Sequence, residues 1–122
     1  MNTQRLDPNI LFVVLPAEPQ LRPELALIRE DVSRTGGLHL VLDLSRVEMI
    51  TSPSIGGLLL TQKVLAEQGC RLVLCNLRLA TKCILRVAGL DTFFECARDK
   101  FGARDILRRP QRSVDRQIRA FD

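Results

Sequence analysis

Residues 38–65 read LHLVLDLSRVEMITSPSIGGLLLTQKVL, and this stretch decides how the chain folds. It opens with a near-continuous apolar run over residues 38–44, in which only His39 and Asp43 are polar, and such a run is typical of a strand covered on both faces of a sheet. A polar turn follows, and the pattern over residues 55–68, closed by Gly69, predicts a helix. The stretch therefore predicts a strand–turn–helix unit of an α/β protein.

Units of the same kind lie on both sides of this stretch. The other predicted strands cover residues 3–7, 10–15, 71–77 and 93–98, and the other predicted helices cover residues 23–34, 80–88 and 102–109. Strands joined by helices imply right-handed crossovers and a largely parallel sheet. We therefore expect an α/β fold with a single domain at residues 3–108, in which a small mixed, mostly parallel sheet is flanked by about four helices. A basic C-terminal tail at residues 109–122 follows it.

The composition narrows the classes of partner. The net charge is +4, and only 4% of the residues are aromatic, with no Trp or Tyr, so the stacking platforms of single-strand binders are missing and no direct nucleic-acid contact is expected. Residues 101–122 contain six Arg against three Asp. This segment is either a solvated terminus or a contact for an acidic partner, a membrane surface or nucleic acid.

Neither a targeting segment nor a metal site is expected. The apolar run Ile10–Leu15 is too short for a signal peptide and ends at Pro16, and no stretch approaches the ~20 apolar residues of a membrane helix. We expect a cytoplasmic protein that does not span a membrane. The four cysteines have no metal-ligand spacing and His39 is the only histidine, so we expect no metal or cofactor, and most of the thiols buried and inert.

Polar side chains gather where the predicted strands end. Ser45 and Arg46 follow one strand, Asn76 and Arg78 follow the next, and Thr51–Ser54 open the central helix. Ligands of parallel α/β sheets collect at this carboxyl edge. Ser52 is the expected N-cap of the helix, with Pro53 as the first helical residue. A phosphate on Ser52 would face the free amides and the positive end of the helix dipole, whereas the alternative is a cap that needs no modification.

No set of residues indicates catalysis. His39 lies inside a strand pattern rather than beside a nucleophile, and Asp43 is placed to cap the turn that follows it. No Gly-rich phosphate loop is present, and Gly56 and Gly57 fall inside the central helix, where small residues allow close packing or partner docking. We therefore expect that the protein is not an enzyme.

Four segments together resemble a known family. They read VLDLSRVEMI (41–50), SIGGLL (54–59), GCRLVLCNL (69–77) and LRVAGLDTFF (85–94). In this order and spacing the chain resembles the STAS domain, the fold of bacterial anti-sigma factor antagonists, over roughly residues 3–108. The resemblance implies a non-catalytic binding module, which in many members is controlled by phosphorylation of a Ser or Thr at the start of the second helix.

The phosphorylation motif of that family reads Asp-Ser-Ser/Thr-Gly-Leu-Gly. Here Ser52 matches the phosphorylated Ser, and Ile55 and Gly56 fit the pattern. The departures from the motif are Thr51 for the Asp, Pro53 for the next hydroxyl and Ser54 for the Gly. The first of these removes a carboxylate beside the hydroxyl, and the second stiffens the loop that a kinase must grip.

The resemblance also implies a partner-binding surface. It comprises Thr51, Ser52, Pro53, Ser54, Ile55, Gly56 and Gly57. The implied partner is an anti-sigma factor or serine kinase of the histidine-kinase-like ATPase type, with Ser52 as the phosphorylated residue. The alternative is a constitutive STAS subunit of a lipid-transport ABC complex or of a larger signalling assembly. A homodimer is left open at this stage.

Overall fold

A computed structural model of the chain describes residues 3–109. The elements follow one another as β1 (Thr3–Asp7), β2 (Ile10–Val14), α1 (Leu21–Thr35), β3 (His39–Asp43), α2 (Ser52–Glu67), β4 (Leu72–Cys75), α3 (Leu79–Val87), β5 (Glu95–Ala97) and α4 (Lys100–Arg108). This order confirms the alternation predicted from the sequence. The tail expected at residues 109–122 lies outside the described residues from position 110 onward.

The five strands form one sheet in the order β1-β2-β3-β4-β5. β1 pairs antiparallel with β2, and the pairs β2–β3, β3–β4 and β4–β5 are parallel. The mixed, mostly parallel sheet expected from the sequence is therefore confirmed. The register places Asp43 opposite Cys75, and Cys75 opposite Ala97, so that the parallel strands end at a common edge.

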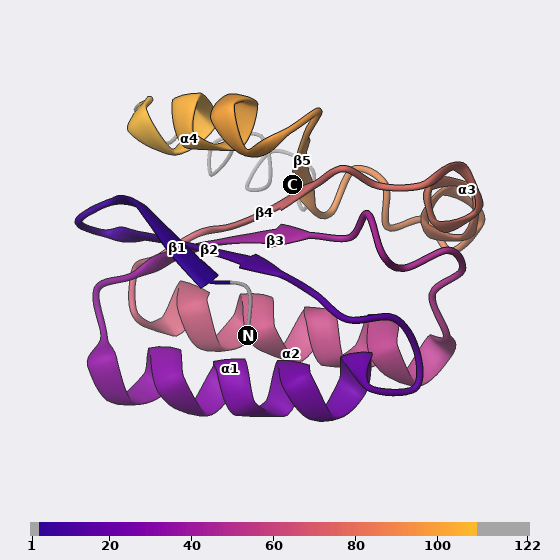
Figure 1. Cartoon of the computed structure of the whole chain (residues 1–122), viewed down its shortest axis with the longest axis horizontal. Coiled ribbons are helices and arrows are strands. Elements are labelled where there is room, and N and C mark those ends of the chain that lie inside the picture. Colours follow the sequence, from indigo (N-terminus) through magenta and orange to yellow (C-terminus); the bar gives the residue numbers. More distant parts are fainter. Residues whose placement is uncertain (1–2, 110–122) are drawn as a thin grey trace, which may run out of the picture.

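Helices cover both faces of the sheet (Figure 1). α1 and α2 lie side by side on one face, α4 lies across the other, and α3 follows the carboxyl end of β4. The central strands are apolar on both sides because both sides are covered. The larger part of the core lies between the sheet and the helix pair; its strand members include Val13, Leu40, Leu42, Leu72 and Leu74. Alternate strand residues face the other way and meet Ala103 and Leu107 of α4.

The central helix begins three residues earlier than the apolar pattern indicated. Thr51 is its N-cap, with extended backbone angles, and the helix runs from Ser52. The prediction of Ser52 as the N-cap was therefore wrong by one residue. The backbone N–H of Ile55 already donates to the Thr51 carbonyl at 3.0 Å, and Pro53 fits the first turn because it has no amide to satisfy.

Candidate functional site

The loop between β3 and α2 is held at both ends. Asp43 Oδ1 accepts a hydrogen bond from the backbone N–H of Ser45 at 2.7 Å, which confirms that this carboxylate caps the turn after the strand. The side chains of Val47 and Ile50 are buried in the core. Thr81 of α3 donates its hydroxyl to the Val47 carbonyl at 3.5 Å. The start of α2 is thereby fixed relative to the sheet.

A carboxylate from another loop occupies the N-terminus of α2. Glu18 lies between β2 and α1, and its Oε2 accepts from the backbone N–H of Thr51 at 3.1 Å and from the Thr51 hydroxyl at 3.0 Å. Its Oε1 accepts from the hydroxyl of Ser54 at 3.0 Å. The backbone N–H of Ser54 in turn donates to Thr51 Oγ1 at 3.4 Å. Negative charge at this end of a helix is stabilised by the helix dipole.

Glu18 was not identified from the sequence as a site residue. It brings a carboxylate to the hydroxyls of Thr51 and Ser54 from more than 30 residues away in the chain. The signal for it is slight but present: Glu18 is the only charged residue between β2 and α1. The loop that carries it leaves the carboxyl end of β2, next to the strand that leads to α2.

The residues predicted to bind a partner do not all reach the surface. Thr51, Ser52 and Pro53 are exposed, and Ile55 and Gly56 are half-buried. Ser54 is fully buried, and Gly57 is buried against the neighbouring helix. The structure therefore brings together two groups: an exposed group that could meet another protein, and a buried group that holds α2 in place.

The two adjacent glycines of α2 have different surroundings. A Cβ on Gly57 would lie 3.1 Å from Leu25 Cδ1 of α1, and Arg29 Nη1 donates to the Gly57 carbonyl at 3.0 Å. Gly57 therefore allows α1 and α2 to approach closely. A Cβ on Gly56 would meet nothing within 4 Å. Nothing within the described part of the chain requires Gly56 to be small.

The exposed side of α2 is uncharged near its start. Ser52, Gly56 and Leu60 follow one another at four-residue spacing and so lie along one side of the helix. Leu60 is 53% exposed, and Met49 in the preceding loop is 62% exposed. No charged residue occurs between Met49 and Lys63. We call Met49, Ser52, Pro53, Gly56 and Leu60 the α2 surface.

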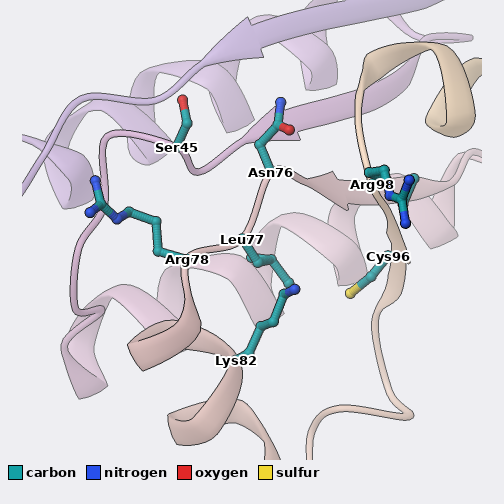
Figure 2. A pocket seen from close by; sticks show the side chains of 8 residues that line it. Ser45, Asn76, Leu77, Arg78, Lys82, Cys96 and Arg98 are labelled. Carbon is teal, nitrogen blue, oxygen red and sulfur yellow. The ribbon is translucent and has the colours of Figure 1, made fainter.

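The other polar residues predicted at the carboxyl edge of the sheet also come together. Ser45, Asn76 and Arg78 line one cavity beside α3 (Figure 2). Arg46 is exposed and is not among the residues that line it. The cavity lies on the α3 side of the sheet edge, apart from the Glu18 carboxylate.

His39 is remote from both places. It begins β3, at the end of the sheet opposite the mouth of α2, and its Nδ1 accepts from the backbone N–H of Arg71 at 2.9 Å. Burial and the nearby Arg71 guanidinium lower the pKa of His39 from its ordinary value of 6.5. The imidazole therefore stabilises the sheet by accepting this backbone hydrogen bond, and it lies far from the hydroxyls of Thr51 and Ser52.

The cysteines divide evenly between interior and surface. Cys70 and Cys75 are buried, and burial raises the pKa of the Cys75 thiol to about 12. Cys83 and Cys96 are exposed, so the expectation that most of the thiols are buried was wrong for these two. In residues 3–109 no cluster of His, Cys, Asp and Glu side chains could hold a metal ion. Over the same residues, no helix is both long and apolar enough to cross a membrane.

Solved structures share this fold at low sequence identity. TM1081 of Thermotoga maritima, a proposed anti-sigma factor antagonist, aligns with a TM-score of 0.71 and 19% identity over 86% of this chain and 92% of that one. RsbS of Moorella thermoacetica aligns with a TM-score of 0.70 and 19% identity over 94% of this chain and 97% of that one. The phosphorylated form of SpoIIAA, a cell fate determinant of Bacillus, gives a TM-score of 0.66 and 14% identity over 88% and 98% of the two chains.

Sequence comparison assigns the family. No curated protein sequence matches the chain. A family profile described as "Mlab, STAS domain" matches residues 22–96, which is more than half of the 122 residues. The profile covers α1 through β5 and therefore includes the α2 surface and the strands that support it. Together with the shared fold, this match shows that the chain belongs to the STAS domain family.

Proposed function

We propose that this protein is a non-catalytic regulatory module that binds a partner protein through the α2 surface. The observation that carries the proposal is an exposed, uncharged helix side on a firmly held helix. Met49 and Leu60 contribute exposed apolar side chains to the α2 surface. Its other three members are a serine, a proline and a glycine, none of which is charged. Exposed apolar patches with few charges are characteristic of protein interfaces.

Gly56 is a second argument that the α2 surface contacts another protein. A glycine inside a helix costs about 1 kcal/mol of stability relative to alanine. No neighbouring atom lies within 4 Å of the place where its Cβ would stand, so the described fold gains no packing in return. A glycine at this half-buried position leaves helix backbone uncovered by a side chain, which suits close approach by another chain.

Within this proposal, Ser52 is a phosphorylation switch in the cytoplasm. The partner is an anti-sigma factor or serine kinase of the histidine-kinase-like ATPase type. The side chain of Ser52 is exposed at the edge of the α2 surface. A phosphate would add about −1.5 to −2 charge to an otherwise uncharged contact and would weaken it through desolvation and repulsion. The structure of phosphorylated SpoIIAA supports the idea by fold alone.

Glu18 favours a second candidate function. Its carboxylate already accepts hydrogen bonds at the mouth of α2, from Thr51 and Ser54. A phosphate on the adjacent Ser52 would lie near this negative charge and would be opposed by it. In the second candidate the α2 surface binds its partner without modification, as a constitutive STAS subunit of a lipid-transport ABC complex or of a larger signalling assembly.

Variants of the α2 surface test the docking proposal. Purified protein is titrated by isothermal titration calorimetry with a candidate partner, either a serine kinase of the histidine-kinase-like ATPase type or a transporter ATPase. We expect Gly56→Arg and Leu60→Asp each to weaken binding by about tenfold or more while the thermal midpoint is retained. Ala26→Arg, at an exposed position on α1, is the matched control and should bind normally. Unchanged binding by both α2 variants would contradict the proposal.

Mass spectrometry separates the two candidates. The protein is incubated with the kinase and ATP, and the intact mass of the wild type is compared with that of Ser52→Ala. One added phosphate that is lost in Ser52→Ala supports the switch. Binding of the transporter ATPase by unmodified protein, with no phosphate added by the kinase, supports the constitutive subunit. A phosphate on another residue contradicts the switch at Ser52.

A further inference from the structure

The outer side of α3 carries an exposed apolar row. The inner side of this helix is held by Thr81 and Leu85, which are buried. On the outer side Leu79, Cys83 and Val87 follow one another at four-residue spacing and so lie along one side of the helix. Leu79 is 76% exposed and Val87 is 89% exposed, the two highest values among the large hydrophobic side chains in the described part of the chain. We call Leu79, Cys83 and Val87 the α3 stripe.

A row of cations runs beside the α3 stripe. Arg78, Lys82 and Arg86 each precede one of its members by one position and are exposed as well; Figure 2 shows the first two extending from α3. Arg86 lies 4.0 Å from Asp91, and among the described residues the other two cations form no ion pair. No Asp or Glu occurs in residues 76–90, so α3 carries positive charge only.

The α3 stripe is separate from the α2 surface. Figure 1 shows α3 beyond the carboxyl ends of the strands, at one extremity of the described chain. The stripe and the α2 surface have no residue in common. An occupant of the stripe is therefore inferred independently of the docking proposed for α2.

A second copy of this chain is a poor occupant of the α3 stripe. If two α3 helices packed antiparallel through their stripes, Arg78 of one copy would lie near Arg86 of the other, and the two Lys82 side chains would lie near each other. Like charges brought together in this way oppose association. The charge of α3 calls for an anionic surface instead.

The α3 stripe is also small for a protein interface. A stable interface takes about 800 Å² and roughly 20–30 residues from each partner. The stripe has only three side chains, and it is about 12 Å long because a helix rises about 1.5 Å per residue. A lipid bilayer makes no such demand, since a few apolar side chains among the headgroups and a few cations beside them allow reversible association.

We propose that the α3 stripe binds the surface of an anionic bilayer. Leu79 and Val87 enter the boundary between headgroups and acyl chains, with the Cys83 thiol between them. The long side chains of Arg78, Lys82 and Arg86 keep their charges at the level of the lipid phosphates. Guanidinium and ammonium groups form strong charge-assisted hydrogen bonds with phosphate oxygens.

Sedimentation with lipid vesicles tests the proposal. The full chain is mixed with vesicles of phosphatidylcholine alone, or of equal parts of phosphatidylglycerol and phosphatidylcholine. We expect the protein to sediment with the anionic vesicles, to stay in the supernatant with the neutral ones, and to be released as sodium chloride is added. An absence of sedimentation with anionic vesicles at low salt would overturn the proposal.

Variants of exposed residues locate the contact. The double variant Leu79→Gln/Val87→Gln should lower the partition coefficient by about tenfold or more, and Arg86→Gln should lower it by about fivefold. All three side chains are exposed, so the thermal midpoint should be retained. Leu27→Gln and Arg22→Gln, at exposed positions on α1, are the matched controls and should sediment as the wild type does. Unchanged sedimentation of both α3 variants would place the contact elsewhere, for example in the basic tail, and overturn the proposal.

Cys83 reports whether the stripe enters the bilayer. Its thiol is exposed in the centre of the stripe. Anionic vesicles should slow its alkylation by a maleimide, and neutral vesicles should leave the rate unchanged, as read by peptide mass spectrometry. The protection should disappear in Leu79→Gln/Val87→Gln. An equal rate with and without anionic vesicles would contradict insertion of the stripe.

Two further measurements detect the other occupants. Sedimentation equilibrium without lipid should show a monomer, and a dimer that dissociates in Leu79→Gln/Val87→Gln would overturn the proposal in favour of a second copy. The same double variant should bind the partner of the α2 surface as the wild type does. Loss of that binding, without sedimentation of the wild type on anionic vesicles, would assign the stripe to the partner protein instead.

Discussion

Among single residues, Glu18 shows how a distant carboxylate fixes the terminus of a helix. Replacing it in Glu18→Ala leaves the buried hydroxyl of Ser54 without its acceptor, and the free energy of unfolding in urea should fall by about 1–2 kcal/mol. Glu48→Ala removes an exposed carboxylate from the loop just before α2 and should change stability by less than about 0.5 kcal/mol. If Glu18→Ala lowered the free energy of unfolding no more than Glu48→Ala does, the Glu18 contacts would not stabilise the fold.

His39 gives the fold a dependence on pH. Its Nδ1 must be unprotonated to accept the Arg71 N–H, and the pKa of His39 is lower in the folded state than its ordinary value of 6.5. The unfolded chain therefore binds more protons between the two pKa values. The stabilisation is complete above pH 6.5 and is lost as the pH falls toward the folded pKa. The urea midpoint should decrease from about pH 7 to about pH 5, and His39→Gln should flatten this decrease. An equally steep decrease in His39→Gln would assign it to other groups.

The site residues were predictable only where local sequence determines them. Thr51, Ser52 and Pro53 stand at a helix start, and their capping chemistry is legible from residue type and spacing. Glu18 was missed because it reaches the start of α2 from the loop between β2 and α1, and no spacing in the sequence pairs these two segments. The N-cap was misplaced by one residue because Ser is by residue type the better cap, whereas in the structure Thr51 holds the cap position and contacts Glu18.

For α2 as an element, the two glycines should respond in opposite ways. Gly56→Ala gains helix propensity into open space, and we expect the free energy of unfolding to rise by up to about 1 kcal/mol. Gly57→Ala brings a Cβ to 3.1 Å from Leu25 Cδ1, and Leu25 is fully buried and cannot move freely. Gly57→Ala should therefore lower stability, although the change in propensity is the same. Urea unfolding of both variants decides the matter, and an equal gain in both would contradict the close approach of α1 and α2.

The elements themselves were largely predictable because hydrophobic periodicity is strong here. Within residues 3–109 each of the nine predicted elements appears in the predicted order, and the central strands are marked by apolar or nearly apolar runs. Their ends were less accurate. The strand predicted over residues 71–77 spans Leu72–Cys75, because Asn76 takes a positive φ and turns the chain toward α3. Turn geometry of this kind depends on the neighbouring strand and is not evident from residue type.

At the scale of the whole molecule, Arg71 joins the sheet edge to the last helix. Its Nε donates to Glu95 Oε2 of β5 at 3.0 Å, and its Nη1 donates to the Ile106 carbonyl of α4 at 3.4 Å. Arg71→Met should lower the free energy of unfolding by about 2–3 kcal/mol, because Glu95 is left half-buried without its counter-charge. The double variant Arg71→Met/Glu95→Met should recover part of the loss in urea unfolding. A double variant as unstable as the sum of the single variants would show that the pair is not coupled.

The sheet order has a consequence for how the protein is made. Every strand lies beside the one that precedes it in the chain, so no strand must be inserted between two that are already paired. The growing chain can add its strands in the order in which they leave the ribosome. α4 then packs beside β1, and the guanidinium of Arg108 donates two hydrogen bonds of 2.8 Å to the carboxylate of Asp7. Among the described elements, the first strand and the final helix to be synthesised are therefore joined by this ion pair.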